Sequence, residues 1–216
     1  MSSLIFYIDE DQALVVTDTL SVTTGGQPTN FTSKALYLPH LRLVVAGTGH
    51  GGFHDRWTHQ INFLAVVRDL EDLDATAPAK LRELWEEANA TLKEMGRTTT
   101  IYHFGVTEAG QVAAYAYRSE NDFRSERLEP GTGIKPVASV PDGNLLEGIE
   151  TIMEEQRRRQ EAKPAAERVH IGGEAIAIYL TPAECRHWTL FRFQDFEQMA
   201  GSARAALVGG APRLAE

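Results

Sequence analysis

Short strands with consecutive apolar residues are the feature that most constrains the fold. Leu14 to Val16 and Leu43 to Val45 are apolar without interruption, whereas a strand with one face in water alternates apolar and polar residues. Both faces of these strands must therefore be covered. A sheet built from them needs a layer of protein on each side.

The strands come in adjacent pairs that are joined by polar turns. We expect strands at residues 4–8, 13–17, 35–38, 42–46, 99–105, 111–117, 123–128, 174–180 and 187–193. The first four should form one meander. Pairing between chain neighbours indicates antiparallel sheets and disfavours Rossmann and ferredoxin-like folds, in which strands alternate singly with helices.

Helical periodicity fills the intervals between the strands. The apolar spacing predicts one helix from His50 to Leu70, a second with Pro78 in its first turn that ends at Gly96, a third from Asn144 to Glu161, and a short one near the C-terminus. This order predicts an α+β fold, a four-layer α-β-β-α sandwich in which helices cover both sheets. We expect one domain over residues 1–216, with a flexible tail from about residue 207.

Composition excludes several classes of function. The chain has 30 acidic and 21 basic residues and a formal net charge of −9, which repels phosphate backbones and anionic membrane surfaces, so we expect no nucleic-acid and no membrane partner. No apolar run approaches the roughly 20 residues that cross a bilayer. The start of the chain does not resemble a signal peptide, and the single cysteine, Cys185, cannot form an intrachain disulfide. A cytoplasmic location is expected.

The start of the chain offers a nucleophile. After removal of Met1, Ser2 would carry a hydroxyl beside a free α-amine, a group with a reference pKa of about 7.7 to 8 that can accept the hydroxyl proton. Hairpin pairing brings Asp18 back beside Ser2, and Lys34 opens the third strand at the same edge. A lysine there favours an oxyanion, and the aspartate orients the lysine. Gly47 and Gly49, at a strand-to-helix junction, offer N–H groups to the developing oxyanion.

This pattern resembles the proteasome-like branch of the N-terminal nucleophile (Ntn) hydrolases, which includes proteasome β-subunits and the HslV protease. The resemblance covers the segments SSLIFYIDEDQALVVTDT, FTSKALYL and LRLVVAGTGHGG, and Asp18 and Lys34 follow Ser2 by 16 and 32 residues, the spacings of that family. It implies Ser2 as the nucleophile of an amide or peptide-bond hydrolase, Lys34 and Asp18 as its electrostatic partners, and Gly47 as the oxyanion donor.

The same resemblance implies partners. It implies a peptide or amide substrate, assembly of the chain with itself into a ring or stacked rings, and no cofactor or metal. An ATP-driven unfoldase would follow if such rings enclose a chamber.

The sequence departs from that family at other positions. Active proteasome-like subunits begin with threonine and carry an Asp-x-x-Ser-Gly pattern near the last helix, whereas this chain has ERVHIGGEAI there, with the glycines but without the acid and the hydroxyl. Thr132 is the single candidate for the family's serine after the middle sheet. A catalytically inactive structural or scaffold subunit of the same fold therefore stays open as the alternative.

A histidine cluster offers different chemistry. His50, His54 and His59 lie with Asp55 at the start of the first expected helix, where residues four apart share a face. Such a cluster can hold zinc or nickel, or it can form polar surface or subunit contacts.

Two further groups have structural interpretations. Cys185 and His187 alternate on a strand without a third partner, which favours a buried thiol over a Cys-His pair. The run from Arg157 to Arg159 is flanked by glutamates and is typical of a solvated helix end.

Overall fold

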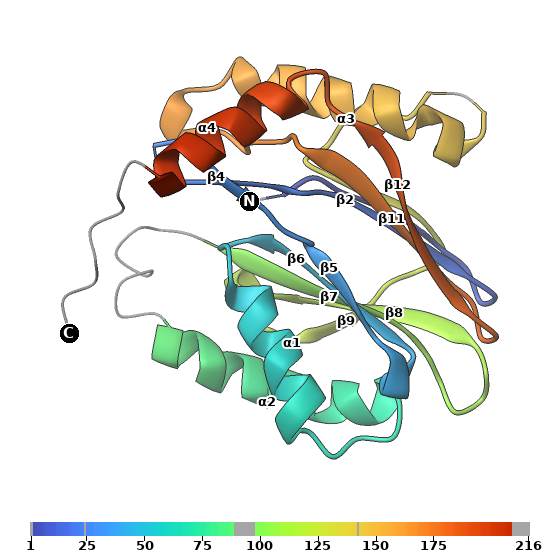
Figure 1. Cartoon of the computed structure of the whole chain (residues 1–216). Coiled ribbons are helices and arrows are strands. Elements are labelled where there is room, and N and C mark those ends of the chain that lie inside the picture. Colours follow the sequence, from blue (N-terminus) through green and yellow to red (C-terminus); the bar gives the residue numbers. More distant parts are fainter. Residues whose placement is uncertain (1, 24, 89–97, 142, 209–216) are drawn as a thin grey trace.

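Two five-stranded antiparallel sheets face each other in the chain (Figure 1). The computed structural model describes residues 2–23, 25–88, 98–141 and 143–208. The first sheet has the order β10-β1-β2-β11-β12, formed by Gly131–Lys135, Leu4–Ile8, Ala13–Asp18, Glu174–Leu180 and Cys185–Arg192. The second sheet has the order β5-β6-β7-β8-β9, formed by Ala35–Leu38, Leu43–Gly49, Thr99–Val106, Val112–Arg118 and Ser125–Arg127.

In the described ranges, the α-helices that accompany the sheets are α1 (Phe53–Leu64), α2 (Leu70–Ala88), α3 (Leu145–Glu161) and α4 (Phe196–Val208). Helices α1 and α2 lie on the outer side of the second sheet, and α3 lies on the outer side of the first (Figure 1). None of the helices in the described ranges has the length and apolar character that a membrane crossing requires.

Three buried clusters account for the consecutive apolar residues. Val15 and Val44 belong to the cluster between the two sheets. Their chain neighbours point the other way: Val16 packs in the cluster beneath α3, and Val45 packs in the cluster beneath α1 and α2. The prediction that both faces of each sheet are covered is therefore confirmed for these strands.

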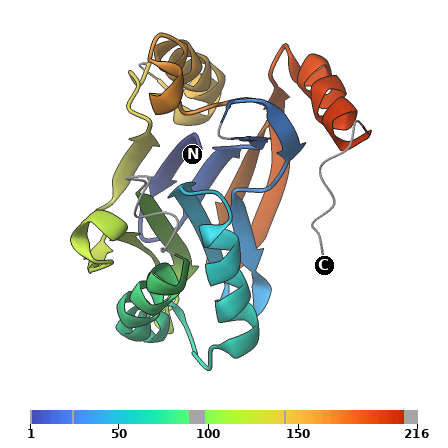
Figure 2. The same ribbon diagram turned by 90° about the vertical axis from the view of Figure 1, so that its left-hand side faces the viewer.

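Helix α4 does not cover either of the five-stranded sheets in the way that the predicted sandwich requires. It packs on β4 (Pro28–Phe31), which pairs with β3 (Leu20–Val22) in a separate two-stranded sheet. The rings of Phe31 and Phe196 stack with their centroids 4.8 Å apart. Figure 2 shows α4 standing to the side of the sheets, so the outer cover of the first sheet comes from α3.

The strand predictions need three corrections. The first four predicted strands do not form one meander, because β1 and β2 belong to the first sheet while β5 and β6 belong to the second. The polar segment between them was expected to be a loop, yet it contains the β3-β4 hairpin. The turn-rich segment after residue 129 contains β10, whose five residues pair with β1.

The helix predictions also change. Residues 65–69 separate α1 from α2, and α2 already begins at Leu70, so Pro78 lies inside α2 instead of in its first turn. The buried side chains of Leu70 and Leu73 favour this earlier start, and Asp69 Oδ1 accepts the Asp72 N–H at 2.9 Å. The expected helix end at Gly96 lies outside the described residues. So does the expected tail, except for residues 207 and 208, which belong to α4.

Candidate functional site

A buried ion pair joins two of the predicted site residues. Lys34 Nζ lies 2.9 Å from Asp18 Oδ1 and 2.8 Å from Oδ2, and the two side chains are 6% and 0% exposed. The N–H groups of Ser3 and Gly172 donate to the same carboxylate at 2.9 and 3.2 Å. Four hydrogen bonds thus replace the hydration that the Asp18 carboxylate loses on burial.

This ion pair lies beside the predicted nucleophile. The Ser3 N–H belongs to the peptide that joins Ser2 to Ser3, and both this nitrogen and Lys34 Nζ lie 2.9 Å from Asp18 Oδ1. Ser2 is two residues before Leu4, which packs between the sheets, so strand alternation turns the Ser2 side chain toward the second sheet. The structure brings Ser2, Asp18 and Lys34 together, as predicted from the hairpin geometry.

The start of β1 is fixed from its other face. Ser3 Oγ donates to Gln156 Oε1 at 2.6 Å, and Gln156 Nε2 donates to the Pro136 carbonyl at 2.5 Å. Gln156 lies on α3 and is 0% exposed. Sequence analysis missed this residue, although a glutamine on the helix face that also carries Ile152 and Met153 was the available signal.

Gly47 also reaches this cluster, but its N–H has a partner. The Gly47 N–H donates to the Lys34 carbonyl at 3.2 Å, which joins the ends of β5 and β6. A Cβ at this position would lie 2.5 Å from His54 Cβ, so only glycine fits. The role predicted for Gly47 as an oxyanion donor would require its N–H to turn away from the Lys34 carbonyl.

His54 covers Gly47 and is not part of a metal cluster. Its side chain is buried, and Nε2 lies 3.2 Å from Asp55 Oδ1. Burial lowers the pKa of His54, the Asp55 charge opposes this shift, and the Lys34 ammonium adds to it. Within the described ranges no three His, Cys, Asp or Glu side chains are grouped as a metal site would require.

The structure also contradicts the expectations for Thr132 and for Cys185. Thr132 lies opposite Tyr7 in the β1-β10 pair, whereas Ser2 lies beyond the other end of β1. Thr132 therefore cannot supply a hydroxyl to the Ser2 cluster. Cys185 is only half-buried and His187 is exposed, although burial raises the pKa of the Cys185 thiol to about 11.

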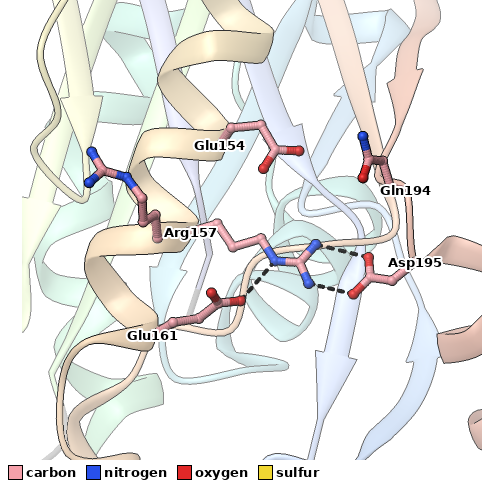
Figure 3. Close-up of a pocket in the computed structure, with 6 residues that line it drawn as sticks. Glu154, Arg157, Glu161, Gln194 and Asp195 are labelled. Atoms are coloured by element: carbon pink, nitrogen blue, oxygen red, sulfur yellow. Dashed lines mark hydrogen bonds and ion pairs between the residues drawn. The ribbon is translucent and has the colours of Figure 1, made fainter.

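A second concave region lies where α3 meets the segment before α4 (Figure 3). This cavity of about 280 Å³ is lined by Glu154, Arg157, Arg158, Glu161, Gln194 and Asp195. Arg157 donates to both carboxylate oxygens of Asp195 and, at 3.1 Å, to Glu161. Its side chain is 20% exposed, so Arg157 joins α3 to the residue before α4. Arg158 and Arg159 are exposed, so the solvated helix end predicted from the arginine run holds for these two and not for Arg157. Arg157 is already paired with two carboxylates, which leaves the Ser2 cluster as the stronger candidate site.

The fold and the cluster define a class: two facing antiparallel sheets with a buried lysine-aspartate pair beside a serine at the start of the first strand. No family model matches the sequence, and no curated protein sequence matches it. Many solved structures are similar to it, among them two Anbu proteins. The Gly-1 mutant of Anbu from Hyphomicrobium sp. strain MC1 has a TM-score of 0.60 and 13% identity over 97% of this chain and 96% of that chain. Anbu (ancestral beta-subunit) from Yersinia bercovieri has a TM-score of 0.56 and 10% identity over 99% of both chains.

These likenesses show a mixed α/β, proteasome-like fold of the Anbu type. They also correct the resemblance drawn from the sequence. That resemblance named proteasome β-subunits and HslV, and this assignment was wrong, because the structural neighbours described above are Anbu proteins.

Proposed function

We propose that this chain is an amide or peptide-bond hydrolase of the proteasome-like fold, with Ser2 as its nucleophile once Met1 is removed. Met1 itself lies outside the described residues. The buried Lys34–Asp18 pair beside the Ser2–Ser3 peptide carries the proposal. An ammonium held next to a hydroxyl lowers the pKa of that hydroxyl and stabilises the oxyanion that forms on attack.

Each residue has a distinct part in this mechanism. The Ser2 α-amine accepts the hydroxyl proton, and the Ser2 Oγ attacks the carbonyl carbon of the substrate. The α-amine then passes the proton to the leaving nitrogen as the amide C–N bond breaks, and water hydrolyses the resulting ester and restores the Ser2 hydroxyl. Lys34 stabilises negative charge, and Asp18 holds the lysine in place through the 2.8 and 2.9 Å contacts. Gly47 donates its N–H to the oxyanion after leaving the Lys34 carbonyl. The mechanism needs no cofactor or metal.

The wider properties implied by the sequence belong to the same proposal. They are a complete four-layer α-β-β-α sandwich, assembly into a homo-oligomeric ring or stacked rings, a peptide substrate, cytoplasmic location and, for a closed chamber, an ATP-driven unfoldase. The layered packing of α1, α2 and α3 on the two sheets supports the first of these.

One observation favours an inactive structural subunit instead. The Asp18 carboxylate already accepts four hydrogen bonds, and the Gly47 N–H is bonded to the Lys34 carbonyl. A network that satisfies its own members can be kept for folding alone. In that case the ion pair would hold β2, β5 and the loop at Gly172 together without any chemistry.

The two functions differ in how Ser2 reacts and how variants fold. We would prepare protein that begins at Ser2 by removing an N-terminal fusion, and protein that retains Met1 as its matched control. A β-lactone or epoxyketone probe should label the first and not the second, with the added mass located on Ser2. Ser2→Ala should remove labelling without changing the melting temperature, because a small side chain at a strand start contributes little to packing.

The ion-pair variants complete the test. Under the hydrolase proposal, Lys34→Ala should lower the labelling rate on the order of a hundredfold or more. Asp18→Asn should lower it less, and Lys80→Ala, on the exposed face of α2, should leave it unchanged. Absence of labelling in Ser2-terminated wild type, together with a melting loss in both ion-pair variants that reflects about 3 to 5 kcal/mol, would leave the structural subunit as the function.

A further inference from the structure

Next to Gly47, a row of polar side chains lies at the edge of the core between the two sheets. Ala46, Tyr102 and Ala116 are cross-strand neighbours in the second sheet and belong to the core between the sheets. Thr48, Thr100 and Arg118 form the next row on the same face, two residues further along each strand. This second row therefore faces the first sheet at the edge of the core where Ser2 lies.

Lys135 approaches that row from the opposite sheet. It is the last residue of β10 and lies opposite Leu4. Its Nζ donates to Thr100 Oγ1 at 3.0 Å, which bridges the first sheet to the second. Ser2 is two residues before Leu4, about 7 Å along the strand direction. A peptide bound with its scissile amide at Ser2 would place a neighbouring residue within reach of Lys135.

Lys135 forms no ion pair within the part of the chain that the structure describes, while Arg118 is paired with Glu126. The Lys135 side chain is open to solvent at this edge of the core. Nevertheless, burial by the surrounding protein lowers its pKa, Arg118 lowers it further, and Glu120 opposes this shift. An ammonium that loses part of its hydration beside a guanidinium is in an unfavourable position unless an anion joins it.

We propose that Lys135, Thr100 and Arg118 form a carboxylate-binding subsite beside Ser2, which selects peptides with an acidic side chain close to the scissile amide. The inference deepens the proposed hydrolase function and rests on it. Lys135 supplies the charge, and the Thr100 hydroxyl, which now accepts from Lys135, can turn to donate to the carboxylate. Arg118 adds positive potential while it keeps its bond to Glu126.

Binding tests the subsite without turnover. Ser2→Ala protein would be titrated with three dye-labelled, C-terminally amidated peptides that differ only in Glu, Gln or Lys at the residue next to the central amide. Fluorescence anisotropy should give about tenfold tighter binding for Glu than for Gln at low salt, with the preference shrinking as salt rises. A Gln peptide with a free C-terminal carboxylate distinguishes an acidic side chain from a chain terminus as the ligand, and it should bind like the amidated Gln peptide.

Substitutions of Lys135 test whether its charge causes the preference for the Glu peptide. Lys135→Met should remove the difference between the Glu and Gln peptides, Lys135→Arg should retain it, and Lys80→Met should leave it unchanged. Equal affinity for Glu and Gln, weak binding of all three peptides, a preference for the free C-terminus, or a Glu preference that survives Lys135→Met would each overturn the subsite.

Its failure can be distinguished from failure of the hydrolase. Ser2-terminated wild type would be assayed for cleavage of the same peptides and for labelling at Ser2. A Lys135-dependent Glu preference in binding without labelling would keep the subsite and reject the hydrolase. Cleavage of Glu and Gln peptides at the same rate, with equal affinities, would keep the hydrolase and reject the subsite.

Discussion

Acid should destabilise this fold through His103. The His103 side chain is 0% exposed, and its Nε2 accepts a hydrogen bond from Trp57 Nε1 at 2.8 Å. The imidazole also stacks on the Trp57 ring and contacts the Tyr117 ring, with centroids 6.0 and 4.8 Å away. Burial lowers the pKa of His103 to about 3. The folded protein therefore holds this histidine neutral at all ordinary pH values.

The size of the effect follows from proton linkage. In the unfolded chain a histidine has a pKa of about 6.5, so between that pH and 3 the unfolded state binds a proton that the folded state does not. The free energy of unfolding consequently falls as the pH falls, by about 1.4 kcal/mol per pH unit below 6.5. The loss at pH 5 relative to neutral pH should be about 2 kcal/mol.

His103→Gln isolates this contribution. A glutamine can offer Oε1 to the Trp57 N–H but cannot titrate, so the variant keeps the acceptor and loses the pH dependence. Urea unfolding at pH 7.5, 6 and 5 should show a smaller loss of stability in the variant than in wild type, by about 2 kcal/mol at pH 5. The exposed His187 gives a matched control, since His187→Gln should follow wild type. Parallel stability curves for wild type and His103→Gln would refute the argument.

Two other contacts yield predictions that unfolding experiments can check. Gly47→Ala should destabilise the fold by about 1 to 3 kcal/mol, because the new Cβ would lie 2.5 Å from His54 Cβ, whereas Gly51→Ala enters open space and should cost much less; equal losses would contradict this. Gln156→Leu should cost about 1 to 3 kcal/mol for each buried group it leaves unpaired, Ser3 Oγ and the Pro136 carbonyl, with the exposed Gln198→Leu as control. A loss no larger than that of the control would show that water replaces the glutamine.

Strands with strong apolar patterns were predictable, and those without one were not. Val15 and Val16 define β2 and its two covered faces in sequence. By contrast, β10 is made of Gly131 to Lys135, with two glycines and a threonine, and it owes its conformation to pairing with β1. The β3-β4 hairpin was missed for a similar reason, since its polar residues depend on α4 and on the ring contact between Phe31 and Phe196.

Some residues of the candidate site could be predicted from the sequence, and others could not. Ser2, Asp18 and Lys34 could be placed together because they lie at strand ends that a hairpin and a neighbouring strand bring to one edge. The hydrogen bond of the Gly47 N–H was not predictable, since its direction depends on how β5 and β6 are paired. Lys135 could not be found from the sequence, because the residues of β10 are typical of a turn and only the pairing of Lys135 with Leu4 places its ammonium at this edge of the core.

The geometry at Gly47 connects stability to chemistry. Gly47 has no Cβ, so His54 can cover the junction. Its N–H donates to the Lys34 carbonyl, and the Asp18 carboxylate binds Lys34 Nζ. Turning the Gly47 N–H toward an oxyanion would therefore disturb the backbone of the residue whose ammonium stabilises the same charge. A hydrolase must recover that lost bond from the substrate oxyanion, which is the stronger acceptor. An inactive subunit has no such compensation and would keep the Gly47–Lys34 bond permanently.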